Sequence, residues 1–258
     1  MPSRTRPRIG LVLGGGAVRG LAHLGVLTVL ERAGVPIDCV SGTSVGSAIG
    51  AIYCATGDIH KFQHLAHTVR WRDLARLTWP KHGWISFDRL ERWLVALVGD
   101  LTFDELRTPF ACVATDLERG EPVVLREGRL AAAVRASCSI PGIVAPVRRD
   151  GRWLGDGCVS DNLPVAAARA LGADYVVAVD ICLPAFRGRW GPLGVGFTGL
   201  ESAIRHAGGG VRGADCLIVP DLAGFSYARF SRRDEMIARG VAAAEAALPQ
   251  IQTALSKR

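Results

Sequence analysis

A short apolar segment followed by three glycines, and the helix, strand and glycine turn that come after it, constrain the fold of this chain more than any other feature of its sequence. Residues 9–13 are entirely apolar, and three glycines follow them directly. The next segment, 19–33, is apolar on most sides of a helical axis, which predicts a buried helix. A second short strand at 37–41 leads into a sharp turn and then a helix of small residues to about 56. This order of strand, helix, strand and helix predicts a mostly parallel sheet covered on both faces.

The remaining sequence continues this alternation. Further strands are expected at 110–115, 175–180 and 216–220, with 122–126 as an edge strand. Helices are expected at 130–136 and 231–255. The segment 60–107 is expected to be helical, with breaks at Pro80 and Gly83. Residues 188–213 hold nine glycines and are expected to form a long mobile connection. The chain has 258 residues, 49% of them hydrophobic, and no internal repeat, so we expect one α/β domain over 1–258.

Charge and cysteine usage limit the classes of function. The net charge of +7 fits either a solvated basic surface or attraction to anionic lipid head groups. The arginines form no dense run with interleaved aromatics, so we expect no nucleic-acid partner. Seven scattered cysteines without a CxxC pair predict neither a disulfide framework nor a metal site, and they favour a reducing compartment.

Hydropathy along the chain bears on membranes and targeting. No apolar run approaches the roughly 20 residues that span a bilayer. The apolar run after the basic segment MPSRTRPR is too short for the core of a signal peptide. We therefore expect a cytoplasmic protein. None of these patterns addresses the oligomeric state.

The turn after the second strand has the sequence GTSVGS and contains a GxSxG motif at Gly42, Ser44 and Gly46. A serine on a sharp turn between strand and helix is the arrangement of a nucleophile elbow, in which flanking glycines relieve steric crowding. Its hydroxyl then lies beside a helix N-terminus, which favours a developing negative charge. The alternative interpretation is an ordinary strand-to-helix turn, because glycine and serine are common turn residues.

The glycine-rich segment after the first strand has three interpretations. Its residues are Gly14, Gly15, Gly16, Ala17, Val18, Arg19 and Gly20. Converging backbone N–H groups could form an oxyanion hole, or the segment could bind a dinucleotide, or it could be a tight turn. Arg19 stands where the Rossmann pattern needs its third glycine, although Asp38 lies at a suitable distance for a ribose contact. No GK[ST] follows, which excludes a Walker A loop.

A general base for Ser44 is the remaining requirement. Asp156 lies between Gly155 and Gly157, on backbone that can approach another side chain closely. No histidine occupies a late strand-end loop, where a triad would usually place it, so an aspartate acting directly on the serine is the simpler hypothesis. Asp116, Asp161 and Asp180 also lie near strand ends or loops and are rival bases.

The three motifs, in this order, resemble those of the patatin-like phospholipases, especially the short bacterial members. The resemblance covers roughly 8–240 and includes the stretches ATDLERGEPVVLREG, RASCSIPGIVAPV and DNLPV. It implies a three-layer α/β/α fold and no metal or other cofactor. It assigns the nucleophile to Ser44, the base to Asp156, and the oxyanion hole to Gly14, Gly15, Gly16 and Ala17, with support from Arg19, Gly20, Gly42, Gly46 and Gly157.

The resemblance implies a serine acyl hydrolase that cleaves carboxylic esters of lipids through an acyl-enzyme. One departure bears on activity, because Cys158 occupies the third position of the family's DG[GA] motif. If the backbone is strained there, a residue with a Cβ is less favourable than glycine. A non-catalytic or regulatory lipid-binding protein of the same fold therefore stays open. An acyltransferase is a third hypothesis, since an alcohol can capture the same acyl-enzyme in place of water.

The segment 68–93 combines four tryptophans with several cations. Tryptophan and arginine are suited to a membrane interface, so the segment could be a lid or a docking surface for peripheral contact with an anionic membrane. The alternative is a helical flap packed on the core. Arg19 likewise has three candidate roles: holding the glycine loop, contacting a lipid phosphate, or standing as a surface arginine at a helix start.

Overall fold

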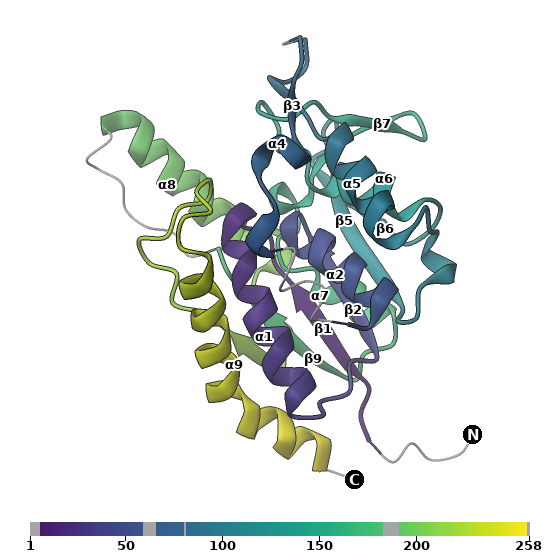
Figure 1. The fold of residues 1–258 in the computed structure, drawn as a ribbon, viewed down its shortest axis with the longest axis vertical. Helices are drawn as coiled ribbons and strands as arrows, with labels where there is room; N and C mark the ends of the chain where they lie inside the picture. Colours follow the sequence, from purple (N-terminus) through teal and green to yellow (C-terminus); the bar gives the residue numbers. More distant parts are fainter. Residues whose placement is uncertain (1–5, 59–65, 80, 183–190, 257–258) are drawn as a thin grey trace.

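A mixed, mostly parallel sheet is the centre of the molecule in the computed structural model, which describes residues 6–58, 66–79, 81–182 and 191–256 (Figure 1). The strand order is β10-β9-β1-β2-β5-β8-β7, with β6 also paired to β5. The first five strands are parallel to their neighbours, and β6, β8 and β7 pair antiparallel. The strands are β1 (Ile9–Leu13), β2 (Cys39–Thr43), β5 (Phe110–Asp116), β6 (Glu121–Leu125), β7 (Val147–Arg149), β8 (Arg152–Asp156), β9 (Tyr175–Val179) and β10 (Cys216–Ile218).

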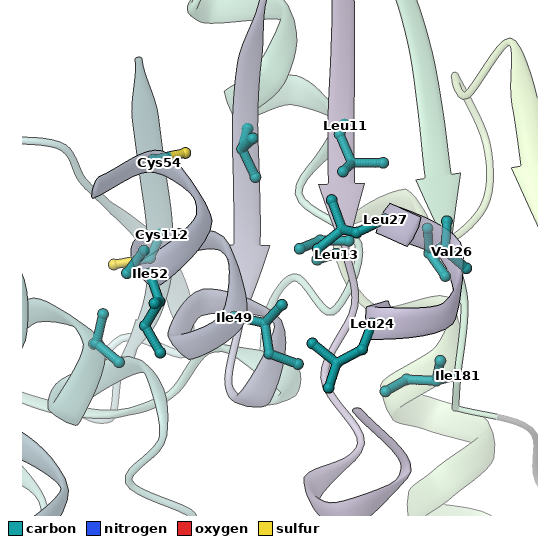
Figure 2. Packing of buried hydrophobic residues seen from close by; sticks show 14 of the residues in the cluster. Leu11, Leu13, Leu24, Val26, Leu27, Ile49, Ile52, Cys54, Cys112 and Ile181 are labelled. Atoms are coloured by element: carbon teal, nitrogen blue, oxygen red, sulfur yellow. The ribbon is translucent and has the colours of Figure 1, made fainter. Parts of the chain in front are cut away.

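Helices cover both faces of this sheet, as the alternation of buried side chains along its strands requires. Leu11 and Leu13 of β1 point to one face, where they pack with Leu24 and Ile49 (Figure 2). Val12 between them belongs to a second core on the opposite face. The first face is covered by α1 (Leu21–Arg32), α2 (Val45–Thr56), α5 (Asp88–Val98), α6 (Leu130–Ser137) and α9 (Arg233–Ser256), and the second by α7 (Val165–Ala170). The expected three-layer α/β/α architecture is confirmed.

Helices α1 and α9 lie side by side along one flank (Figure 1) and approach each other through glycine. A Cβ added at Gly25 of α1 would overlap the carbonyl oxygen of Ile237, and one added at Gly240 of α9 would overlap that of Ala22. The two backbones are therefore too close for any larger residue at either position. No described helix is both long and apolar enough to cross a membrane.

Strand β5 extends beyond the end of β2 and so provides a place for β8. The last pair between β2 and β5 is Thr43 with Val113, and the pairing of β8 begins at the next residue of β5, Ala114 opposite Asp156. Since β6 occupies the other edge of β5 over the same residues, β8 must continue along the edge that β2 uses. The end of β8 is thus brought directly beyond the end of β2.

The β7–β8 hairpin was absent from the sequence prediction, although its turn carries a recognisable signal. Asp150 and Gly151 both have positive φ (50° and 77°), as a two-residue Asp-Gly hairpin turn requires. The flanking residues are rich in arginine and only partly buried, so the apolar alternation that marks other strands is weak here. The turn chemistry was therefore the better guide to this element.

Two expectations for connecting segments were wrong. Within 188–213, the structure has helix α8 (Gly191–His206) where a mobile connection was expected; residues 188–190 lie outside the described residues. Contacts offset the low helix propensity of glycine, because Glu201 is buried and Arg205 binds Asp180 at 3.0 Å.

The segment 60–107 is helical only in part. Between the short helix α4 (Trp71–Leu74) and α5, the structure has a small antiparallel hairpin of β3 (Arg76–Leu77) and β4 (Ile85–Ser86). The expected break at Gly83 falls inside this hairpin, whereas Pro80 and residues 59–65 lie outside the described residues. A Cβ at Gly83 would overlap the backbone of Ala145, so close packing accounts for this glycine.

Candidate active site

Ser44 lies at the junction of β2 and α2, in backbone that is unusual for a residue with a side chain. Its φ and ψ are 54° and −128°. A Cβ at Gly42 would lie 2.6 Å from the Gly46 carbonyl oxygen, and a Cβ at Gly46 would overlap the Leu13 carbonyl. Both flanking glycines are therefore sterically required. Such a strained turn holds the serine at the carboxyl edge of the sheet, at the N-terminus of a helix.

Two neighbouring serines hold the Ser44 backbone in place. The Ser44 N–H donates to Ser137 Oγ at 3.0 Å, and Ser137 in turn donates to the Val113 carbonyl at 2.6 Å. Ser47 Oγ donates to the Ser44 carbonyl at 2.6 Å. The elbow is thereby tied to β5, the strand that also carries β8.

The side chain of Ser44 is hydrogen-bonded to Asp156. Ser44 Oγ donates to Asp156 Oδ2 at 2.6 Å, and the backbone N–H of Cys158 donates to Oδ1 at 2.9 Å. Asp156 is completely buried, and this desolvation raises the pKa of its carboxyl to about 6, against the lowering effect of the hydrogen bonds from Ser44 and Cys158. At neutral pH the group is ionised, yet it is a stronger base than an ordinary aspartate.

Asp156 reaches this position through contacts at the end of β8. Its N–H donates to the Ser139 carbonyl at 2.7 Å, and its own carbonyl accepts from Thr115 Oγ1 at 2.7 Å. A Cβ at Gly157 would overlap the Val113 carbonyl, so this position requires glycine. Cys158, by contrast, has an ordinary negative-φ backbone, since it is not among the described positive-φ residues. The backbone strain expected at Cys158 is therefore absent.

The three rival carboxylates have other surroundings. Asp116 accepts from Arg119 at 3.0 Å, and Asp180 accepts from Arg205 at 3.0 Å. Asp161 touches the elbow only through its backbone carbonyl, which accepts from Thr43 Oγ1 at 2.9 Å. Burial raises the pKa of the Asp161 carboxyl to about 7. Of the four candidate carboxylates, Asp156 is the one that is hydrogen-bonded to the hydroxyl of Ser44.

The glycine loop lies against Ser44, and its first peptide is held from both sides. Gly14 O accepts from His23 Nε2 at 2.8 Å, and the Gly15 N–H donates to Asn162 Oδ1 at 3.1 Å. Burial lowers the pKa of His23 to about 4, so the ring is neutral and its Nε2 carries the donated proton. A Cβ at Gly15 would lie 2.7 Å from Asn162 Oδ1 and 3.1 Å from the Cβ of Ser44, so glycine permits this close approach.

These contacts narrow the set of oxyanion donors. The N–H of Gly14 donates to the Val179 carbonyl at 3.1 Å, and that of Gly15 is taken by Asn162. For Gly16 and Ala17, no hydrogen bond from the N–H is found within the described part of the chain. Gly14 and Gly15 therefore shape the loop, while the two residues after them remain candidates as donors.

His23 and Asn162 were not recognised as site residues from the sequence. The sequence indicated Asn162 only as part of the DNLPV stretch. The signal for Asn162 was its place six residues after Asp156, in a segment that returns to the same sheet edge. The contact of Asn162 with the glycine loop is long-range, with 147 residues separating it from Gly15, whereas His23 is nine residues from Gly14.

A dinucleotide site does not fit this geometry. Asp38, the candidate ribose ligand, precedes β2 and so lies at the opposite edge of the sheet from the glycine loop. Its carboxylate is bonded to Arg6 at 2.7 and 2.9 Å and to the Ile9 N–H at 2.7 Å. Among the described residues, no group of three or more metal-ligating side chains is found.

Arg19 is a buried structural residue, with 1% of its surface exposed. Its Nε and Nη2 donate to the Phe225 carbonyl at 3.1 and 2.9 Å, and its Nη1 donates to Tyr227 Oη at 2.7 Å. The hypothesis of a surface arginine is therefore wrong, and this arginine ties the glycine loop to the segment before α9. The side chain of Val45 packs directly against Gly20, and a Cβ at Gly20 would overlap it.

Replacing Arg19 by Ala is expected to destabilise the protein by about 2–4 kcal/mol, because the buried Phe225 carbonyl loses both guanidinium donors and Tyr227 loses its hydrogen bond from Arg19. Urea unfolding would measure the change, with Arg32→Ala on the exposed end of α1 as the matched control. Arg32 pairs with Glu245 at the surface and should cost less than about 1 kcal/mol. Equal stability of the two variants would contradict the structural role of Arg19.

An apolar cavity opens beside Ser44. It encloses about 910 Å³ including its open mouth and is lined by side chains of α1, α2, α4, α5 and the segments around 140 and 230. Leu24 and Ile49 (Figure 2) belong to its wall, together with Trp71, Phe87 and Trp93. No charged side chain lines it among the described residues. Such a cavity is suited to an alkyl chain, since apolar surface is removed from water on both sides of the contact.

The fold and the site together define a class of protein. A GxSxG serine at a strained elbow, a buried carboxylate hydrogen-bonded to it, a glycine loop against it and an apolar cavity beside it occur here on a three-layer α/β/α scaffold. Residues 11–169, more than half of the chain, match the patatin-like phospholipase family. The chain belongs to this family, which is one of lipid ester hydrolases.

Relatives and solved structures agree with this assignment. An uncharacterised NTE family protein of Mycobacterium tuberculosis is 39% identical over 178 residues, covering 68% of this chain and 49% of the relative. Lysophospholipase nte1 of Aspergillus fumigatus is 37% identical over 180 residues, covering 67% of this chain and 12% of that protein. The matched region thus spans about half the length of the mycobacterial relative.

Structures with low sequence identity share the fold. VipD from Legionella pneumophila superimposes with a TM-score of 0.63 at 16% identity, covering 96% of this chain and 67% of VipD. The type III effector protein ExoU gives a TM-score of 0.54 at 14% identity, covering 95% of this chain and 54% of ExoU. The confirmed features are therefore the family and its fold.

Proposed function

We propose that this protein is a serine acyl hydrolase that cleaves a carboxylic ester bond of a lipid through a Ser44–Asp156 dyad. The observation that carries the proposal is the 2.6 Å hydrogen bond from Ser44 Oγ to the buried Asp156, at the wall of an apolar cavity. Family membership supports the lipid ester as substrate, and the relatives named lysophospholipase support a lipid with a single acyl chain among the candidates.

The chemistry proceeds in two steps of acyl transfer. As Ser44 Oγ attacks the ester carbonyl, Asp156 takes its proton, and the carbonyl oxygen becomes an oxyanion that the N–H groups of Gly16 and Ala17 can hold. The tetrahedral intermediate expels the alcohol, which takes the proton from Asp156. Water then attacks the acyl-Ser44 ester and gives a proton to Asp156. Release of the fatty acid returns that proton to Ser44 Oγ.

The surroundings of Asp156 suit this role. An aspartate at its usual pKa is a weak base toward serine, and burial raises the pKa of Asp156 to about 6 without preventing ionisation at neutral pH. The hydrogen bond from Cys158 N–H fixes the carboxylate so that its other oxygen faces Ser44. Peripheral contact with an anionic membrane is part of the proposal, since the substrate is a lipid.

Covalent labelling by a fluorophosphonate probe tests this function. The wild-type protein is expected to gain the mass of one phosphonyl group, because the probe reacts with a serine activated beside an oxyanion site. The Ser44→Ala variant should gain none, whereas Ser202→Ala on the exposed side of α8 should label like the wild type. Intact mass spectrometry after equal incubation would distinguish these results.

Failure of the folded wild type to label would contradict the proposal. It would favour the non-catalytic lipid-binding hypothesis, with Cys158→Gly as the first reversion to the family's motif. Labelling that persists in Ser44→Ala would place the reactive nucleophile elsewhere in the chain.

A further inference from the structure

Large apolar side chains are exposed on the β3–β4 hairpin to an extent unmatched elsewhere on the described surface. Trp79 is 86% exposed, Leu77 83% and Trp84 64%. Ile143, also exposed, lies beside them, because the N–H groups of Trp84 and Ile85 both donate to its carbonyl at 2.8 and 3.0 Å. Since contiguous exposed apolar surface marks an interaction site, these four side chains, here called the hairpin patch, need a partner.

The hairpin is held on the body of the protein. Figure 1 shows it projecting at one end of the molecule. The His82 ring lies 5.3 Å from that of Trp153 on β8, and Gly83 packs against the backbone of Ala145. At its base Arg76 donates to Asp88 at 2.7 Å. These contacts attach the hairpin to β8, to the segment around Ala145 and to the first residue of α5.

The same segment also builds the apolar cavity. Trp71 and Leu74 precede the hairpin and line the cavity, and Phe87, Leu90 and Trp93 follow the hairpin and line it too. Ile140, three residues before Ile143, lines it as well. Trp71 reaches the surface while lining the cavity. The residues of the patch and several residues of the cavity wall thus alternate along the same segment of the chain.

Charge around the hairpin identifies the partner. Residues 70–92 carry six arginines or lysines against three acidic residues, so this segment supplies a net +3 of the chain's +7. Asp88 is paired with Arg76 and Arg92. Arg72 lies 3.8 Å from Asp73, and 75% of its side chain is exposed. Tryptophan beside cations is the composition of a surface that enters the head-group region of an anionic bilayer.

We propose that the hairpin patch docks this protein on an anionic lipid bilayer, with Trp79, Trp84 and Leu77 entering the interface. Docking in this orientation brings the cavity mouth to the membrane surface, so that an acyl chain passes from bilayer to cavity without crossing water. The docking itself rests on the hairpin alone, while its use in catalysis rests on the function proposed above.

Vesicle flotation with variants of the hairpin tests this surface. The full chain is mixed with vesicles of phosphatidylcholine, with or without phosphatidylglycerol, and the floated fraction gives the partition coefficient. The double variant Trp79→Ser/Trp84→Ser is expected to lower partitioning to anionic vesicles at least about tenfold. Arg72→Gln should lower it about fivefold on anionic vesicles and leave binding to neutral vesicles unchanged.

A matched control separates this surface from general hydrophobicity. Leu200 on α8 is 51% exposed, and Leu200→Ser should leave partitioning unchanged, in contrast to Leu77→Ser. Equal loss in the two leucine variants, or wild-type partitioning of the tryptophan double variant, would overturn the proposal. A third result would also overturn it: the wild type associates with itself but does not bind vesicles, and the double variant no longer associates. The patch would then bind a second copy of the chain.

Hydrolysis of a soluble short-chain ester distinguishes failure of docking from failure of the proposed function. The hairpin variants should retain the wild-type rate on this ester and lose rate only on lipid within vesicles. A wild type that labels with fluorophosphonate but does not float would refute docking alone. A wild type that floats through the hairpin but hydrolyses neither substrate would refute the function and leave docking in place.

Discussion

Replacing Asp156 by Asn is expected to lower kcat/KM for ester hydrolysis by about 10³- to 10⁴-fold, with the fold intact. Asparagine has the same shape and can still accept from the Cys158 N–H, but it cannot take a proton from Ser44. Steady-state kinetics on a soluble ester would measure the loss. For the wild type, kcat/KM should rise with pH about a midpoint near pH 6 and level off near neutral pH, where most of Asp156 is ionised.

The same substitution is expected to stabilise the protein at neutral pH. The pKa of Asp156 is raised from 3.8 to about 6 in the folded state, so between these values the folded protein binds more protons than the unfolded chain. Stability of the wild type therefore falls as pH rises through this window. The Asp156→Asn variant avoids that loss, which is on the order of 3 kcal/mol above pH 6 and vanishes below about pH 4. Urea unfolding at several pH values would measure it.

Asp161→Asn is the matched control for this pair of effects. Asp161 is buried near the site and burial raises its pKa to about 7, but its carboxylate is not bonded to Ser44. The variant should also gain stability at high pH while kcat/KM stays within about tenfold of the wild type. If Asp161→Asn rather than Asp156→Asn abolished hydrolysis, the assignment of the base would be wrong.

Replacing Gly240 by Ala is expected to destabilise the protein by more than about 3 kcal/mol, the largest effect on stability that we predict for one methyl group. The new Cβ would overlap the carbonyl oxygen of Ala22 on α1, and backbone cannot move aside as a side chain can. The helices α1 and α9 would have to separate, which opens the core between them. Chemical denaturation of the purified variant would measure the loss.

The opposite sign is expected for a glycine in open space. Nothing lies within 4 Å of a Cβ at Gly199 on α8, so Gly199→Ala should stabilise by about 0.5–1 kcal/mol through helix propensity alone. Gly240→Ala and Gly199→Ala are thus expected to change the free energy of unfolding in opposite directions. Equal effects would show that α1 and α9 are not in the close contact described.

Features governed by neighbouring residues could be predicted from sequence. The short segments before Gly14 and Gly42 correctly indicated the strands β1 and β2, although β2 begins two residues later than expected. The elbow at Ser44 followed from local sterics, because glycines two residues away on each side permit a turn that a Cβ would block. The edge strand β6 was likewise predicted within one residue at each end.

Features that depend on contacts between distant segments were predicted less well. The glycines of α8 indicated a loop, but Arg205 and Glu201 anchor that segment as a helix. The role of Arg19 stayed open among three hypotheses until its partners, 206 and 208 residues away, were known. The N–H of Gly15 was expected at the oxyanion hole, and it is held by Asn162.

The sequence by itself determined the sheet class, the family and the strained turn at Ser44, because each of these depends on a short run of residues and its backbone sterics. The family resemblance named Asp156 as the base, but only the tertiary structure shows which of four aspartates lies against that serine. The reason is the register of β8, which begins on β5 where β2 stops and so brings Asp156 to Ser44 from 112 residues away. Such a register depends on the whole sheet, and no local pattern contains it.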